Sequence, residues 1–164
     1  MRVEEIMTPD PVVCRKDTTV REAAALLKEY RIGGLPVTDG DKVVGIVTES
    51  DILGLLSTGR ISEDLWLPSP LELIEVPVRE LINWERTRKA LSNIGETKVS
   101  EVMSHPVISA TSDMEIEEAA ALMLRHRIAR LPVIQDGRLI GIVARADIIR
   151  GVGGRHTQDT EGAA

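Results

Sequence analysis

The chain of 164 residues carries a formal net charge of −6, with 26 acidic and 20 basic side chains, and 43% of its residues are hydrophobic. This composition is ordinary for a globular protein with one core. The acidic balance disfavours binding of nucleic acid through a basic surface. Because Phe is absent and aromatic residues make up only 2% of the chain, binding of single strands by base stacking is disfavoured too.

No apolar run is long enough to span a bilayer, and the first ten residues lack the basic and apolar regions of a signal peptide. Cys14 is the single cysteine, which excludes an internal disulfide framework. We therefore expect a cytoplasmic protein that does not associate with membranes.

The first part of the chain has the pattern of a small α/β unit. A short helical turn is expected near 3–7, followed by a strand near 12–14. Val20, Ala23, Ala24 and Leu27 then fall on one face of a predicted helix. Two strands over 35–38 and 42–47 flank an Asp-Gly-Asp turn, and a second helix is predicted to begin after Thr48.

The segment 57–98 has a different character, and we interpret it as a connector rather than a third domain. Prolines interrupt its first half, and an amphipathic helix is predicted from Val78 to about Ile94. Its apolar positions are Leu81, Ile82, Trp84 and Leu91.

The remainder of the chain repeats the first pattern. We predict a turn near 99–103 and a strand near 107–109, followed by a helix with Ile116, Ala119, Ala120 and Met123 on one face. Strands over 131–134 and 139–143 and a helix after Ala144 complete the second copy. Residues 20–53 align without a gap with 116–149, at about fifteen identities in about 34 positions. Residues 153–164 are expected to form a disordered tail.

The duplication predicts a defined fold class. We expect an α/β fold of two β-α-β-β-α repeats, related by a pseudo-two-fold axis and packed through their sheets into one module. The expected divisions are repeat 1 at 1–56, the connector at 57–98, repeat 2 at 99–152 and the tail at 153–164. Such an arrangement creates two equivalent clefts between the halves, so function is expected where the copies meet.

Thr48 and Asp51 form the most informative polar pair. They follow a buried strand at a spacing of three, at the expected N-terminus of a helix, where unpaired N–H groups and the helix dipole favour an anion such as phosphate. The Asp carboxylate also matches a vicinal diol. The alternative is a capping box, which is the commoner reason for this spacing. In the second copy Ala144 replaces the hydroxyl, whereas Asp147 retains the carboxylate.

At this point the chain resembles the cystathionine-beta-synthase (CBS) domain family, whose tandem pairs are called Bateman modules. The resemblance rests on IMTPDPVVCRKDTTVREAAALLKEYRIGGLPVTDGDKVVGIVTESDIL and on VMSHPVISATSDMEIEEAAALMLRHRIARLPVIQDGRLIGIVARADII. It implies a regulatory module that binds adenosyl compounds (AMP, ADP, ATP or S-adenosylmethionine) in composite clefts between the repeats. It also implies pairing of two modules into a homodimer.

The resemblance assigns ligand-binding residues to each cleft. One cleft takes Thr48, Asp51, Ser104, Val107, Ile128 and Arg130; the other takes Thr8, Val12, Ile32, Gly34, Arg145 and Asp147. Ala144 offers no hydroxyl, and Arg145 is the expected substitute as a phosphate contact.

The residues predict no enzyme and no metal site. His105, His126 and His156 lack metal-ligand spacing, and neither a nucleophile-base set nor a phosphate-binding glycine motif is present. We therefore expect a sensor that requires no cofactor, binds an adenine nucleotide and signals occupancy to an effector protein that the sequence does not name. The alternative is a scaffold or dimerisation module with degenerate clefts.

Overall fold

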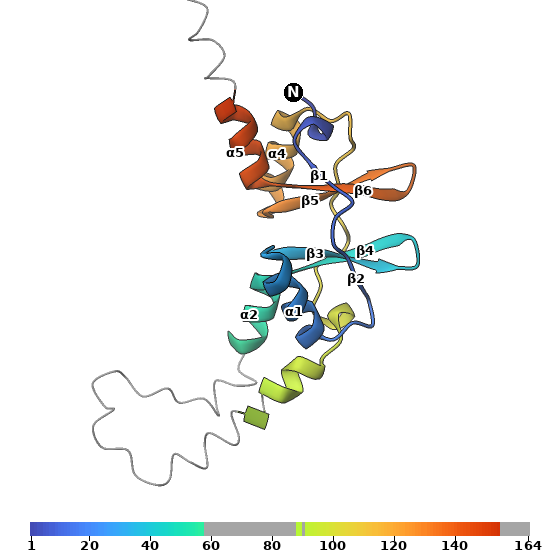
Figure 1. Ribbon diagram of the computed structural model, residues 1–164, viewed down its shortest axis with the longest axis vertical. Coiled ribbons are helices and arrows are strands. Elements are labelled where there is room, and N and C mark those ends of the chain that lie inside the picture. The colour runs from blue at the N-terminus through green and yellow to red at the C-terminus, as the bar shows by residue number, and fades with distance from the viewer. Residues whose placement is uncertain (58–87, 90, 155–164) are drawn as a thin grey trace, which may run out of the picture. The chain divides into compact units, whose positions relative to one another are not determined.

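The computed structural model describes residues 1–57, 88–89 and 91–154. Helices and strands alternate along both repeats, and each repeat contributes one hairpin to a three-stranded sheet (Figure 1). The fold is therefore mixed α/β, as the sequence predicts.

The first repeat contains a 3-10 turn at Val3–Glu5, β1 at Thr8–Pro9 and β2 at Cys14–Arg15, and then α1 at Val20–Tyr30. The hairpin of β3 (Gly34–Asp39) and β4 (Lys42–Thr48) follows, and α2 covers Glu49–Ser57. The second repeat has a 3-10 turn at Val99–Glu101, α4 at Ile116–His126, β5 at Arg130–Gln135, β6 at Arg138–Ala144 and α5 at Arg145–Gly154.

The chain divides into two compact units whose boundaries differ from those of the repeats. Unit 1 contains Met1–Val13, Thr38–Gly45 and His105–Ala164, and unit 2 contains Cys14–Val37 and Ile46–Ser104. Each unit thus holds the opening segment of the opposite repeat. Both opening segments are bound by main-chain hydrogen bonds.

In unit 1 the sheet order is β1-β6-β5, all antiparallel, and Thr8 pairs with Ile142. Val3 N–H donates to the carbonyl of Met114 (2.9 Å). Val3 is fully buried and packs in one cluster with Met123, Leu131 and Val143. A side chain at Gly141 would approach Met7 Sδ to 2.6 Å, so the absence of a Cβ at this position allows β1 to lie against β6.

The second sheet has the order β2-β3-β4, and all of it except Thr38–Gly45 belongs to unit 2. Ser104 forms an antiparallel bridge with Ile46, and the two exchange backbone hydrogen bonds of 2.9 and 3.2 Å. This bridge is the counterpart of the Thr8–Ile142 pair in unit 1. The buried apolar side chains of the unit are Cys14, Val20, Ala23, Leu27, Leu35, Val37, Ile46, Val47 and Val99. Burial raises the pKa of the Cys14 thiol to about 11.

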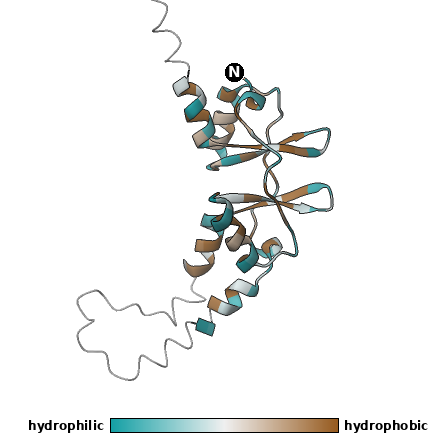
Figure 2. Ribbon diagram, viewed as in Figure 1, coloured by the Kyte–Doolittle hydropathy of each residue, from teal (hydrophilic) through white to brown (hydrophobic). Residues whose placement is uncertain are grey.

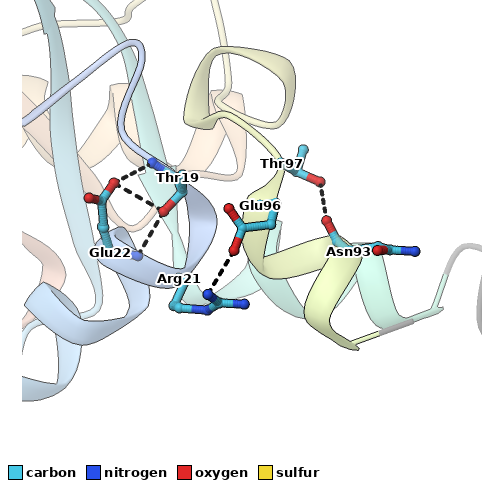
Figure 3. Close-up of polar contacts among 6 residues, drawn as sticks. All are labelled: Thr19, Arg21, Glu22, Asn93, Glu96 and Thr97. Atoms are coloured by element: carbon cyan, nitrogen blue, oxygen red, sulfur yellow. Dashed lines mark hydrogen bonds and ion pairs between the residues drawn. The ribbon is translucent and has the colours of Figure 1, made fainter. Parts of the chain in front are cut away.

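Helix α1 begins at a complete capping box (Figure 3). Thr19 Oγ1 accepts from Glu22 N–H (3.2 Å), and Glu22 Oε2 accepts from Thr19 N–H (2.8 Å). Arg21 on the same turn forms an ion pair of 2.7 Å with Glu96, which joins the end of the connector to α1. Both partners of this ion pair are largely exposed, so its contribution to stability is small.

Four predicted details differ from the structure. The strand predicted near 12–14 is β2 at Cys14–Arg15, and residues 107–109 form no strand, although Ala110 makes an isolated bridge with Val133. Ala24 is exposed, because the buried stripe of α1 consists only of Val20, Ala23 and Leu27. Helix α5 continues to Gly154 and so includes residues 153–154 of the expected tail.

In the connector, residues 88–89 and 91–96 are helical, and Leu91 is half exposed. The predicted apolar positions Leu81, Ile82 and Trp84 lie outside the described residues, as does the segment 155–164.

Figure 2 shows hydrophobic colouring along the strands and hydrophilic colouring at the hairpin turns. The two hairpin turns contain Gly40 and Gly137 at positive φ (59° and 78°), a backbone conformation that glycine adopts without strain.

Candidate functional site

The strand-to-helix junction of unit 2 is the first part of the candidate site. Strand β4 ends at Thr48 and α2 begins at Glu49, so Asp51 is the third residue of the helix. Asp51 Oδ2 accepts from Thr48 N–H (2.7 Å) and from Thr48 Oγ1 (2.9 Å), and Thr48 Oγ1 accepts from Asp51 N–H (3.3 Å). The predicted alternative, a capping box, is therefore present.

The second carboxylate oxygen of Asp51 has a different partner. Ser104 Oγ donates to Asp51 Oδ1 across 3.4 Å, which is long for a bond between a hydroxyl and a carboxylate. The bridge between Ile46 and Ser104 brings the serine to this position. Capping thus uses Oδ2, whereas Oδ1 accepts only a weak bond from Ser104 among the contacts of the described residues.

The corresponding junction of unit 1 lies between β6 and α5. Asp147 Oδ2 accepts from Ala144 N–H (2.7 Å), which repeats the backbone half of the capping box without a hydroxyl. Asp147 Oδ1 forms a hydrogen-bonded ion pair with the guanidinium of Arg150. Asp147 is buried, at 7% exposure, whereas Asp51 is only half-buried. The two carboxylates therefore share one anchoring bond but differ at the outer oxygen.

The first residue of each helix is held by the loop that precedes the opening strand of the hairpin. Arg145 N–H donates to the carbonyl of Ala129 (2.9 Å), and Glu49 N–H donates to the carbonyl of Gly33 (3.2 Å). Arg145 makes a further bond from Nε to the carbonyl of Ile128 (3.2 Å). The guanidinium thus stands at the N-terminus of α5, where the dipole already favours an anion.

The structure brings together some of the predicted site residues. Thr48, Asp51 and Ser104 form one hydrogen-bonded group in unit 2, and Ile128 and Arg145 are bonded in unit 1. Ile32 and Gly34 also belong to unit 2, whereas Thr8, Val12, Val107, Arg130 and Asp147 belong to unit 1. Because the expected sets combine residues of both units, the composite clefts stay predictions.

Arg150 was not among the predicted site residues. Its signal in the sequence is the spacing of three from Asp147, which places an acid and a base on neighbouring positions of a helix. That spacing is common on exposed helix faces and does not by itself indicate a site.

Within 1–57, 88–89 and 91–154, no three His, Cys, Asp or Glu side chains gather as metal ligands would. Among the described helices, none combines the length and the apolar character needed to cross a bilayer.

The chain thus contains two copies of one α/β unit, each with an anchored aspartate at the start of its last helix. The CBS domain model matches residues 3–58 and 99–154, and the chain belongs to the CBS domain family.

Relatives resemble the chain over most of its length. The uncharacterized protein MJ1426 of Methanocaldococcus jannaschii is 42% identical over 151 residues, which are 91% of this chain and 89% of that protein. CBSX2, solved in complex with AMP, is 27% identical, with a TM-score of 0.66 over 94% of this chain and 98% of that one. The CBS domain pair of MJ0100, solved with 5-methylthioadenosine and S-adenosyl-L-methionine, is 25% identical, with a TM-score of 0.69 and the same coverage.

Proposed function

We propose that the chain is a regulatory module that binds adenosyl ligands through Asp51 and Asp147. The observation that carries the proposal is that the two oxygens of each carboxylate have different partners. One oxygen is fixed by a backbone N–H at 2.7 Å, and the other is held in a set orientation at the start of a helix. A fixed carboxylate oxygen is a suitable acceptor for the two hydroxyls of a ribose.

The helix N-terminus adjoining each aspartate supplies the second element of recognition. The dipole of the helix favours the phosphate of a nucleotide, which the ribose would bring to this end of the helix. The ligands solved with CBSX2 and with MJ0100 share adenosine and differ in the 5′ group. Adenosine is therefore the common part that we expect this chain to recognise, with AMP, ADP, ATP and S-adenosylmethionine as the candidates.

A thermal-shift series tests the proposal. Melting is measured with AMP, ADP, ATP, S-adenosylmethionine and, as a control that lacks adenine, GMP. A ligand at about 100 times its Kd stabilises by about 2.7 kcal/mol, which a melting curve detects. The double variant Asp51→Asn with Asp147→Asn should lose the shift. If no adenosyl compound moves the melting temperature, the module is a scaffold with degenerate clefts and the proposal is wrong.

We further propose that the module acts as a homodimer that signals to a separate effector in the cytoplasm, without catalysis of its own. Exposed apolar side chains on the outer helices support the pairing. Leu124 on α4 and Ile149 on α5 are 74% and 71% exposed, and Leu53 on α2 is 62% exposed. A second copy of the chain would remove these side chains from water.

Light scattering at micromolar concentration should give about twice the chain mass of 18.0 kDa. Leu124→Glu should return the protein to the monomer mass, whereas Val13→Glu, at a residue 39% exposed outside these helices, should not. A monomer in the unchanged protein would contradict the pairing.

A further inference from the structure

The two candidate aspartates occupy equivalent positions in the repeats, but their outer oxygens are not equally available. Asp51 Oδ1 accepts one long bond of 3.4 Å from a serine hydroxyl. Asp147 Oδ1 is paired with the guanidinium of Arg150. Since the Asp147 side chain is 8% exposed and that of Arg150 is 72% exposed, the arginine lies on the solvent side of the carboxylate.

The difference between the two aspartates follows from the sequence. Residue 150 corresponds to residue 54, one position beyond the aligned segments of the repeats, and residue 54 is glycine. Asp51 therefore has no side chain at the position from which Arg150 reaches Asp147. The first residues of the two helices also differ in charge, because Arg145 starts α5 and Glu49 starts α2.

We propose that Arg150 makes the Asp147 site selective for adenosyl ligands that carry a phosphate. This inference rests on the proposed function. A ribose that binds Asp147 Oδ1 must displace the guanidinium from its carboxylate. A phosphate on the same ligand offers that guanidinium a new anionic partner, and Arg145 at the N-terminus of α5 adds a second cation nearby. A ligand with a neutral or cationic 5′ group leaves Arg150 without compensation and binds less tightly.

The test isolates the Asp147 site in the Asp51→Asn background and compares AMP with 5′-methylthioadenosine by titration calorimetry. These probes share adenosine and differ in the phosphate. Arg150→Gln keeps a long side chain of good helix propensity and removes the charge. We expect the variant to bind 5′-methylthioadenosine about two- to five-fold more tightly, which corresponds to the free energy of an exposed ion pair. Its affinity for AMP should rise by a smaller factor or fall. Arg150→Lys should keep the original preference.

The other repeat supplies a matched gain-of-function variant. A Cβ at Gly54 would meet no atom within 4 Å, so the backbone there accepts the start of a side chain without rearrangement. In the Asp147→Asn background, Gly54→Arg should weaken 5′-methylthioadenosine binding by about two- to five-fold relative to AMP, and Gly54→Gln should not change the ratio.

An unchanged ratio of the two affinities in both Arg150→Gln and Gly54→Arg overturns the inference and leaves the proposed function standing. If the protein without substitutions binds neither probe, the proposed function is wrong and the inference falls with it. A double-mutant cycle on urea unfolding, with Arg150→Gln and Asp147→Asn, checks the ion pair without any ligand. Additive shifts in the unfolding midpoint would show that the pair is too weak to compete, which also overturns the inference.

Discussion

Asp51→Asn separates the capping role of this residue from its proposed role in binding. In the unchanged protein Asp51 Oδ2 accepts from Thr48 N–H at 2.7 Å. In the variant the amide oxygen takes this position, because only an acceptor satisfies the N–H donor. The amide nitrogen then occupies the position of Oδ1, where it donates and cannot accept from a ribose hydroxyl. The substitution thus removes the proposed ligand contact while the helix start stays intact.

The expected loss of affinity follows from the contact that disappears. Hydrogen bonds to a charged group contribute about 1.5–3 kcal/mol, which corresponds to about a 10- to 150-fold rise in Kd for AMP. Asp51→Ala should lose the same affinity and also the carboxylate half of the capping box, which costs about 0.3–1 kcal/mol of stability. Titration calorimetry measures the first quantity and urea unfolding the second.

The comparison of the two variants decides between the interpretations of Asp51. If Asp51→Asn folds normally and binds AMP with unchanged affinity, the carboxylate is only a cap and the reasoning on Oδ1 is refuted. The single variant must be measured beside Asp147→Asn, because the second site could otherwise supply the observed heat.

Three further predictions follow from the described contacts. Asp147→Asn should cost less AMP affinity than Asp51→Asn, since Arg150 already competes for Asp147 Oδ1; calorimetry on the two single variants would contradict this ranking if Asp147→Asn were the more damaging. Val3→Ala should lower the free energy of unfolding in urea by about 2 kcal/mol, because Val3 is buried in the core of unit 1, whereas Val13→Ala at an exposed position should change it little. Hydrogen bonds from the backbone and then the side chain of Thr19 lower the pKa of Glu22 below its ordinary value of 4.5. The stabilisation from Glu22 is therefore complete above pH 4.5 and is lost as the pH falls through the lowered value. The melting temperatures of the unchanged protein and Glu22→Gln should converge as the pH falls through this lowered pKa, and a constant gap would contradict this origin.

Local pattern predicted most of the fold, because each helix and hairpin strand has its own periodicity. The hairpin strands differ from the predicted ranges by one residue at most ends, and α1 buries three of the four residues predicted for its core face. The short opening strands were less well placed: β2 covers Cys14–Arg15 rather than 12–14. Two-residue strands are defined by their partners and carry little pattern of their own.

The packing of each repeat's opening segment against the other repeat could not be predicted from periodicity. Nothing local to Val3 indicates that it packs with Met123 and Leu131 from the other repeat, since only the three-dimensional pairing of β1 with β6 brings it there. The family resemblance, however, grouped Ser104 with Thr48 and Asp51, and these residues are hydrogen-bonded in unit 2. The role of Arg150 was missed because the ion pair depends on which oxygen of Asp147 the cap already uses.

The capping and binding interpretations of the aspartates were alternatives at the level of the sequence, and the geometry makes them compatible. A carboxylate has two oxygens, and the cap consumes only one of them in each unit. The cap would favour the proposed binding, because a carboxylate anchored to its own backbone presents the other oxygen with little further loss of side-chain entropy. A substitution should therefore change ligand affinity without changing stability only where it affects one carboxylate oxygen and not the other, as Asp51→Asn and Arg150→Gln do.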